Sequence, residues 1–229
     1  MSGPSRDAPE PGADHRDEEL LDRLRGGRAP VRAERARLGA AMRRLVATVV
    51  STSADDATLA AATSEIERLA ETLGSGVTRW PAGGGFGAGP GDDMFVTHPL
   101  VGAANPLAPP VVVDVVGNRI VAHATYGPAH EGLPGKVYGG VIATAFDGMA
   151  IFAAVLAGHR GVTGSLEVHF VRPTPIGVEV TYESEVTRVE GRKAFVSGRL
   201  FDSEDVLCVE ATGVIVSVGP DVFDRGAES

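Results

Sequence analysis

The stretch 139–156 constrains the fold of this chain more than any other part of the sequence. Val, Ile, Ala, Phe, Met and Leu cover nearly the whole circumference that a helix would have there. A helix that is apolar on all sides is buried in a domain rather than lying on its surface. Only Asp147 interrupts the pattern. The sequence therefore predicts one long helix at the centre of a folded domain.

Runs rich in β-branched residues surround this helix. They predict strands at 111–116 and 119–126 before it, and at 165–171, 178–189, 193–201 and 206–218 after it. One helix with one antiparallel sheet belongs to the α+β class. The hotdog fold, an antiparallel β-sheet wrapped around one long central helix, is the architecture that we expect. Because a lone wrapped helix leaves one sheet edge and one helix flank uncovered, we also expect dimerisation.

The rest of the chain divides where its composition changes. Residues 1–27 are polar and bear several prolines, which predicts a mobile tail. Apolar residues at spacings of three and four predict a helical hairpin extension over 28–76, whose second helix follows Ser53 as N-cap. This hairpin would pack on the main domain or on a partner subunit. The Gly-rich segment 77–93 lacks the phosphate-loop motifs and is interpreted as a linker, so 94–229 is the main domain.

Composition excludes several classes of function. A formal net charge of −9 argues against a nucleic-acid or anionic-membrane partner. The single cysteine, Cys208, excludes a disulfide framework and a multi-cysteine metal site, and the scattered histidines have no metal-ligand spacing. No metal or redox cofactor is expected. The first residues are polar and the longest apolar stretch contains Asp147, so we expect no membrane span and a cytoplasmic location.

Asp147 is the first candidate for chemistry. It lies in the middle of the apolar stretch with no basic residue within a turn on either side. A buried, unpaired carboxylate costs several kcal/mol and tends to keep its proton, and such an arrangement is typical of functional sites. The alternative is a structural carboxylate that is satisfied by hydroxyl groups such as those of Thr144 or Thr163.

Gly139 and Gly140 at the predicted helix start are the second candidate. The first N–H groups of a helix have no intrahelical acceptor, and glycine lets another molecule approach the backbone closely. Together these features can form an oxyanion hole. Gly139 and Asp147 are eight residues apart, which is about 12 Å along a helix axis. That separation is too large for one carbonyl group, so we expect Gly139 of one subunit to meet Asp147 of another across antiparallel helices.

Several short motifs occur together in one order along 98–218. They are Asn105-Pro106, Pro109-Pro110, Glu131-Gly132-Leu133-Pro134-Gly135, Val137-Tyr138-Gly139-Gly140-Val141-Ile142-Ala143 leading to Asp147, Thr163 with Leu166, Arg172-Pro173-Thr174-Pro175 and Gly191-Arg192-Lys193. This segment resembles the hotdog-fold acyl-CoA thioesterases, in the PaaI-like branch of the 4-hydroxybenzoyl-CoA thioesterase superfamily.

The resemblance implies roles for these residues. The N–H group of Gly139, with that of Gly140, would hold the thioester oxygen. Asp147 would act as general base on a water molecule, or as nucleophile, and the Thr163 hydroxyl would position the water or the carboxylate. The substrate-binding residues implied are Tyr138, Asn105, Phe146, Arg172, Arg192 and Lys193. Phe146 would shape an acyl tunnel, and the three basic residues would meet the nucleotide phosphates unless they are merely solvated turn charges.

One position departs from the family pattern, which usually has His-Gly-Gly. Here Tyr138 precedes the glycines, and a tyrosine does not titrate near neutral pH. The resemblance implies an acyl-CoA thioesterase that acts as an obligate homodimer, with a tetramer left open. Coenzyme A would enter as part of the substrate, and no other cofactor is implied. Two alternatives remain: a non-catalytic acyl-CoA-binding or regulatory protein, and a hotdog hydratase or dehydratase.

Overall fold

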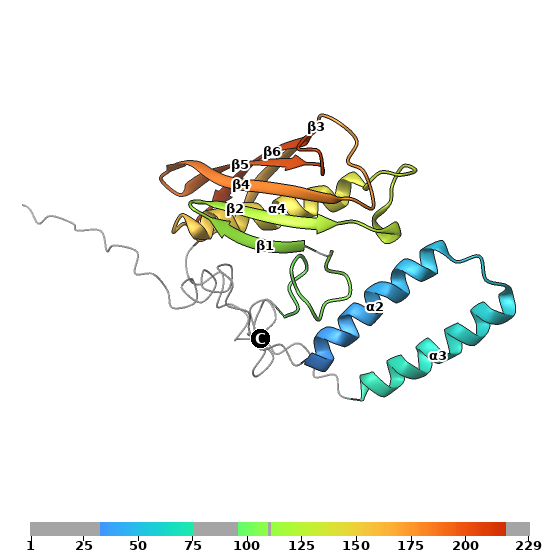
Figure 1. Cartoon of the computed structure of the whole chain (residues 1–229). Coiled ribbons are helices and arrows are strands. Elements are labelled where there is room, and N and C mark those ends of the chain that lie inside the picture. Colours follow the sequence, from blue (N-terminus) through green and yellow to red (C-terminus); the bar gives the residue numbers. More distant parts are fainter. Residues whose placement is uncertain (1–32, 76–95, 110, 219–229) are drawn as a thin grey trace, which may run out of the picture.

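The computed structural model describes residues 33–75, 96–109 and 111–218. The predicted tail 1–27 and the predicted linker 77–93 lie outside the described residues. Within the described part, strands form an antiparallel sheet in the order β1-β2-β4-β5-β6-β3, and this sheet curves over helix α4 (Figure 1). The helix is α4 Gly139–Leu156. The strands are β1 Val111–Val116, β2 Arg119–Thr125, β3 Val162–Phe170, β4 Glu179–Glu190, β5 Lys193–Phe201 and β6 Leu207–Val216. The predicted α+β class is confirmed.

Tight turns connect the two strands of each hairpin, and each contains a glycine with a left-handed backbone conformation. Gly117 has a φ of 64° between β1 and β2, and Gly191 has a φ of 55° between β4 and β5. Glycine adopts this backbone region without the steric cost that other residues meet. These turns fix the register that pairs β1 with β2 and β4 with β5. The order of pairing leaves β1 and β3 as the two edges of the sheet.

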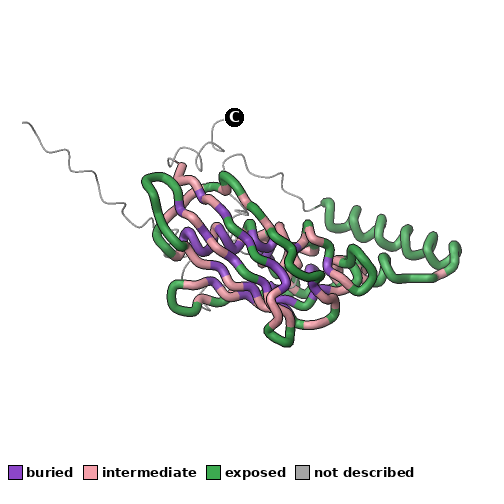
Figure 2. The backbone as a smooth tube through the Cα atoms, turned by 90° about the horizontal axis from the view of Figure 1, so that it is seen from above, coloured by how far each residue is buried: buried purple, intermediate pink, exposed green. Residues whose placement is uncertain are grey.

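The core lies between α4 and the concave face of the sheet, where buried residues concentrate (Figure 2). The Phe146 ring of α4 meets the Tyr182 ring of β4 edge to face, with 5.2 Å between their centroids. The hydroxyl groups of Tyr126 and Tyr182 are 2.7 Å apart and hydrogen-bonded inside this core. Burial raises the pKa of Tyr126 to about 12. The two hydroxyls therefore satisfy each other as neutral groups.

Helix α4 is long and apolar enough to cross a membrane by length and composition, with a mean hydropathy of 1.8 over 18 residues. Half of that window is buried inside the fold, as in the core helix of a globular domain. Among the described residues it is the one helix that meets this criterion.

The loop 96–109 covers the middle of α4. Leu100 is buried against Gly148, where a Cβ atom would come within 2.5 Å of the leucine side chain. The His98 ring lies 5.4 Å from the Phe152 ring, and its Nδ1 atom accepts a hydrogen bond of 3.1 Å from the Leu100 N–H group. Burial lowers the pKa of His98 to about 4. A neutral imidazole is thus part of the packing of this loop.

Two helices precede the domain, as predicted. They are α2 Ala33–Ser51 and α3 Asp56–Gly74, and both extend away from the sheet (Figure 1). The N-cap of α3 is Asp55, whose side chain accepts a hydrogen bond of 2.8 Å from the Thr58 N–H group. The prediction of Ser53 as N-cap was therefore wrong by two residues. Asp at this position satisfies the same unpaired N–H group that a serine would.

Candidate functional site

The loop before α4 holds the start of that helix in a fixed position. The Val137 N–H group donates to the Thr174 carbonyl at 3.0 Å, and the Ile176 N–H group donates to the Gly135 carbonyl at 3.2 Å. Tyr138 is the N-cap residue, and its own N–H group donates to the His130 carbonyl at 2.8 Å. His130 ends the short 3-10 helix η1, Pro128–His130. Backbone contacts from two separate segments therefore position the first turn of α4.

The N–H groups of Gly139 and Gly140 donate no hydrogen bond to any other described residue. They belong to the first turn of α4, where the intrahelical acceptors are missing and the helix dipole is positive. Gly140 is exposed and Gly139 is half-buried. The helix start therefore presents two aligned donors that a developing negative charge can use.

Two aromatic rings lie against these glycines. A Cβ atom on Gly139 would be 3.0 Å from Cζ of Phe170, and one on Gly140 would be 2.5 Å from Cε1 of Tyr138. Both rings are partly exposed, Phe170 by 50% and Tyr138 by 61%. A side chain at either glycine would have to displace the neighbouring ring, so glycine lets both rings pack against the helix start.

Asp147 lies on the exposed flank of α4. It shares this flank with Thr144, three residues before it, and with Gly140, four residues before Thr144, and both are also exposed. The Thr144 hydroxyl donates to the Gly140 carbonyl at 2.9 Å rather than to the carboxylate. The prediction that Asp147 is buried in apolar surroundings is therefore wrong for the single chain. The prediction of one uncovered helix flank describes its position correctly.

The single chain does not bring Thr163 near Gly139. Thr163 lies at the start of β3, whereas Phe170, which contacts Gly139, ends the same strand. Seven residues of extended strand span about 23 Å. Gly139, Asp147 and Thr163 are thus spread along α4 and its neighbouring edge strand.

The three residues predicted to bind the nucleotide phosphates, Arg172, Arg192 and Lys193, lie at two different ends of α4. The Arg192 carbonyl lies 3.2 Å from Nε2 of His159, which follows the C-terminal end of α4, and Lys193 begins β5 beside it. The 18 residues of α4 place this cluster about 27 Å from Gly139. Arg172, by contrast, follows the Phe170 end of β3 and lies on the Gly139 side of the domain.

The side chains of two predicted substrate-binding residues, Phe146 and Asn105, make contacts within the domain. Phe146 is 2% exposed and packs in the core on Tyr182, and its predicted part in an acyl tunnel stays a prediction. The Asn105 side chain is used at both ends, because Oδ1 accepts from the Leu107 N–H group at 2.9 Å and Nδ2 donates to the Thr97 carbonyl at 3.1 Å. Asn105 therefore shapes the loop 96–109.

Sequence reasoning missed Phe170 as part of the site. The alternating pattern of β3 places it on the same face as Leu166 and Val168, which pack toward the core. Its half-exposed ring lies 3.0 Å from the position that a Cβ atom on Gly139 would take. The one signal in the sequence was the position of Phe170, an aromatic residue at the end of the alternating pattern of β3. Across the described residues, no group of three His, Cys, Asp or Glu side chains is placed to hold a metal ion.

Comparison with known proteins adds independent information. Residues 134–209, which include the start of α4, Asp147 and Thr163, match the family model of the thioesterase superfamily. Acyl-coenzyme A thioesterase THEM4 of Xenopus laevis is 36% identical over 103 residues, which are 44% of this chain and 46% of that protein. The same enzyme of Bos taurus is 34% identical over 96 residues, or 42% of this chain and 39% of that protein. The chain thus spans less than half the length of these relatives.

A solved structure extends the likeness to most of the chain. The crystal structure of a thioesterase superfamily protein aligns with a TM-score of 0.74 at 27% identity, over 83% of this chain and 94% of the other. The domain beginning at Val96 makes up too little of the chain to account for that coverage, so the helical extension is part of the match. Residues 134–209 therefore belong to the thioesterase superfamily, and the domain built around them has the hotdog fold.

Proposed function

We propose that this protein is an acyl-CoA thioesterase that hydrolyses a thioester to a free acid and coenzyme A. The observation that carries the proposal is the pair of unpaired N–H groups at Gly139 and Gly140, on the same exposed helix flank as Asp147. The family match over 134–209 includes all three residues. The relatives named acyl-coenzyme A thioesterase support the substrate class.

The reaction follows from the chemistry of these groups. The thioester carbonyl oxygen binds at the Gly139 N–H group, where the helix start stabilises the negative charge that develops on it. Asp147 takes a proton from a water molecule as the oxygen of that water attacks the carbonyl carbon. The C–O bond forms, the C–S bond breaks, and the departing thiolate takes up the proton that Asp147 accepted from the water, which returns Asp147 to its carboxylate form. Because a thiolate is a stable leaving group, this mechanism needs no strong general acid.

The active site is composite in this proposal. Within one chain Gly139 and Asp147 are about 12 Å apart along the α4 axis, which is too far for both to reach one carbonyl group. A two-fold homodimer with antiparallel α4 helices brings Gly139 of one subunit to Asp147 of the other. The exposed flank of α4 and the unpaired edge of β3 support such a dimer, because both are uncovered in the single chain. Thr163, at the far end of β3, enters the site only through this arrangement.

Tyr138 takes the place of the histidine that usually precedes the two glycines. Its ring lies against Gly140, and its N–H group fixes the helix start through the His130 carbonyl. Both contacts position the backbone, and neither needs a group that titrates near neutral pH. The proposed role of Tyr138 is therefore to orient the oxyanion-binding turn.

A panel of acyl-CoA substrates with a thiol-reactive chromophore tests the proposal. We expect wild-type turnover and a loss of at least about 100-fold in kcat for Asp147→Asn, which keeps the size of the side chain. Asp114→Asn is the matched control, because Asp114 is also exposed but lies on β1, at the opposite edge of the sheet from β3. Equal turnover by wild type and Asp147→Asn would remove the assignment of Asp147.

The same panel separates the two alternatives. A protein that binds acyl-CoA without hydrolysis would give a binding isotherm in calorimetry and no thiol release. A hydratase would change the absorbance of an enoyl-CoA without releasing thiol. Either result would replace the thioesterase proposal while leaving the fold assignment intact.

A further inference from the structure

The two N-terminal helices expose an unusual amount of apolar surface. The large apolar side chains that are at least one-third exposed are Leu38, Val46, Val49 and Val50 on α2 and Leu59, Ile66, Leu69 and Leu73 on α3. In Figure 2 this hairpin projects beyond the domain; α3 is exposed along its whole length, and α2 alternates between exposed and partly buried residues. Contiguous apolar surface of this kind marks a contact with another molecule.

Helix α2 attaches to the domain through Gly39 and Arg43, and it also contacts η1. Gly39 is its buried residue, and a Cβ atom there would lie 2.5 Å from the Ala103 carbonyl oxygen. Arg43 donates to the carbonyls of Asn105 and Ala103 at 2.9 and 3.2 Å. The larger apolar side chains of Leu38, Val46 and Val49 stay exposed beside this contact, by 37%, 38% and 56%.

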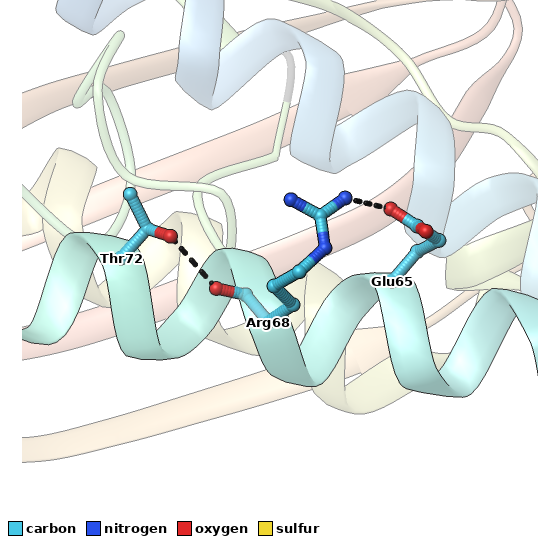
Figure 3. Close-up of polar contacts among 3 residues, drawn as sticks. All are labelled: Glu65, Arg68 and Thr72. Carbon is cyan, nitrogen blue, oxygen red and sulfur yellow. Dashed lines mark hydrogen bonds and ion pairs between the residues drawn. The ribbon is translucent and has the colours of Figure 1, made fainter.

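Helix α3 has no buried residue, and it scarcely touches any other described element. Part of its polar side is paired within the helix, since Glu65 pairs with Arg68 and the Thr72 hydroxyl donates to the Arg68 carbonyl at 2.9 Å (Figure 3). Beside this polar row, Ile66, Leu69 and Leu73 follow one another at spacings of three and four residues and form an exposed apolar stripe. Most of the stability of protein helices comes from packing of an apolar side, and the apolar stripe of α3 packs on no described element. A partner surface would supply that packing.

The charges of the two helices are complementary. Helix α2 carries Arg35, Arg37, Arg43 and Arg44 against the single acidic residue Glu34, and is basic even though Arg37 pairs with Glu34 and Arg43 binds the domain. Helix α3 carries Asp56, Glu65, Glu67 and Glu71 against the single basic residue Arg68, and is acidic. Within one chain the two helices nevertheless stand apart (Figure 1), although a connection as short as 52–55 usually joins helices that pack on each other.

We propose that the α2–α3 hairpin is a dimerisation arm that packs against the same hairpin of a second copy of this chain. In a two-fold pair, the basic α2 of one copy lies along the acidic α3 of the other, and the apolar sides of the four helices form a common core. Contacts between two α2 helices or two α3 helices would instead place like charges together. This interface is additional to the α4 contact and does not depend on the reaction proposed above.

Cross-linking between differently tagged full-length chains tests the proposal. One chain carries Val46→Cys on α2 and the other carries Leu69→Cys on α3. The native Cys208 is 1% exposed and does not compete for a short bis-maleimide reagent. We expect a covalent heterodimer that is captured through both tags. Leu107→Cys replaces Val46→Cys as the matched control, because Leu107 is 82% exposed but lies in the loop 96–109, and it should give little product.

A double variant, Val46→Cys with Leu69→Cys in one chain, distinguishes the remaining arrangements. An intrachain link in this variant, with no heterodimer from the mixed chains, would show that each hairpin closes on itself and would overturn the proposal. An absence of both products would show that the apolar sides stay open or are covered by another part of the chain, and would overturn it as well. Because no arm of the experiment measures turnover, its outcome is separate from that of the thioesterase assay.

Discussion

The ring of Phe170 rests on Gly139, so close that a Cβ atom on the glycine would be 3.0 Å from Cζ of the ring. This contact joins the end of edge strand β3 to the start of the core helix. It also places an aromatic side chain beside the N–H group that we assign to the thioester oxygen. Strand β3 and helix α4 therefore meet at the point where the proposed chemistry takes place.

Gly139→Ala is expected to lower kcat/KM for acyl-CoA by about tenfold or more, because the new methyl group displaces either the Phe170 ring or the helix start. The double variant Gly139→Ala/Phe170→Ala removes the steric conflict and should recover part of the loss. Steady-state kinetics of the two single variants and the double variant form a thermodynamic cycle. Additive effects would mean that the contact between these residues does not set the geometry of the site.

Gly198→Ala is expected to destabilise the fold by about 1–3 kcal/mol, because it overpacks the core. A Cβ atom there would lie 2.7 Å from Cε1 of Phe146, a ring that is already held against Tyr182. Gly213→Ala is the matched control on the neighbouring strand, where the nearest atom to a Cβ is 3.5 Å away. Urea denaturation of both variants measures the difference, and a similar stability for the two would contradict the packing argument.

Stability is expected to fall between pH 6.5 and about pH 4 in part because of His98. Burial lowers the pKa of His98 from 6.5 to about 4, so in this range the unfolded chain binds a proton that the folded chain does not. The contribution of neutral His98 to the free energy of unfolding is fully present above pH 6.5 and is lost as the pH falls toward 4. His130 acts in the same direction, since burial also lowers its pKa. Denaturation across this range should show a smaller slope for His98→Asn, which keeps an acceptor for the Leu100 N–H group.

If His98→Asn changed the overall stability but left the pH slope as in the wild type, the slope would have to come from other groups. The imidazole would then be important for the shape of the loop 96–109 alone. Measurements at pH 8, where His98 is neutral in both states, provide the reference for separating the two effects.

Much of the domain could be predicted from local sequence signals. The bounds of α4, β1 and β5 agree with the predicted segments 139–156, 111–116 and 193–201. Paired glycines before an apolar run and glycine turns between β-branched runs are strong local signals. The N-cap of α3 was harder, because Ser53 and Asp55 are both good capping residues and only the hydrogen bond to Thr58 decides between them.

The position of Asp147 shows why the site was predicted less well than the fold. Counting apolar neighbours suggested burial, whereas the helical face shared with Gly140 and Thr144 is small and polar and is exposed in the chain. The separation of Thr163 from Gly139 depends on which end of β3 lies beside the helix start, and periodicity carries no information about that. Tertiary placement decided both cases.

The backbone ties that run from Val137 and Gly135 to Thr174 and Ile176 have a consequence for how a ligand would be received. They immobilise the donor groups during folding, so that the entropy of ordering this turn is already lost before any encounter. An incoming carbonyl meets amide dipoles that are already oriented, and it need not induce their alignment. Association at this end of α4 should therefore proceed with little local rearrangement of the protein.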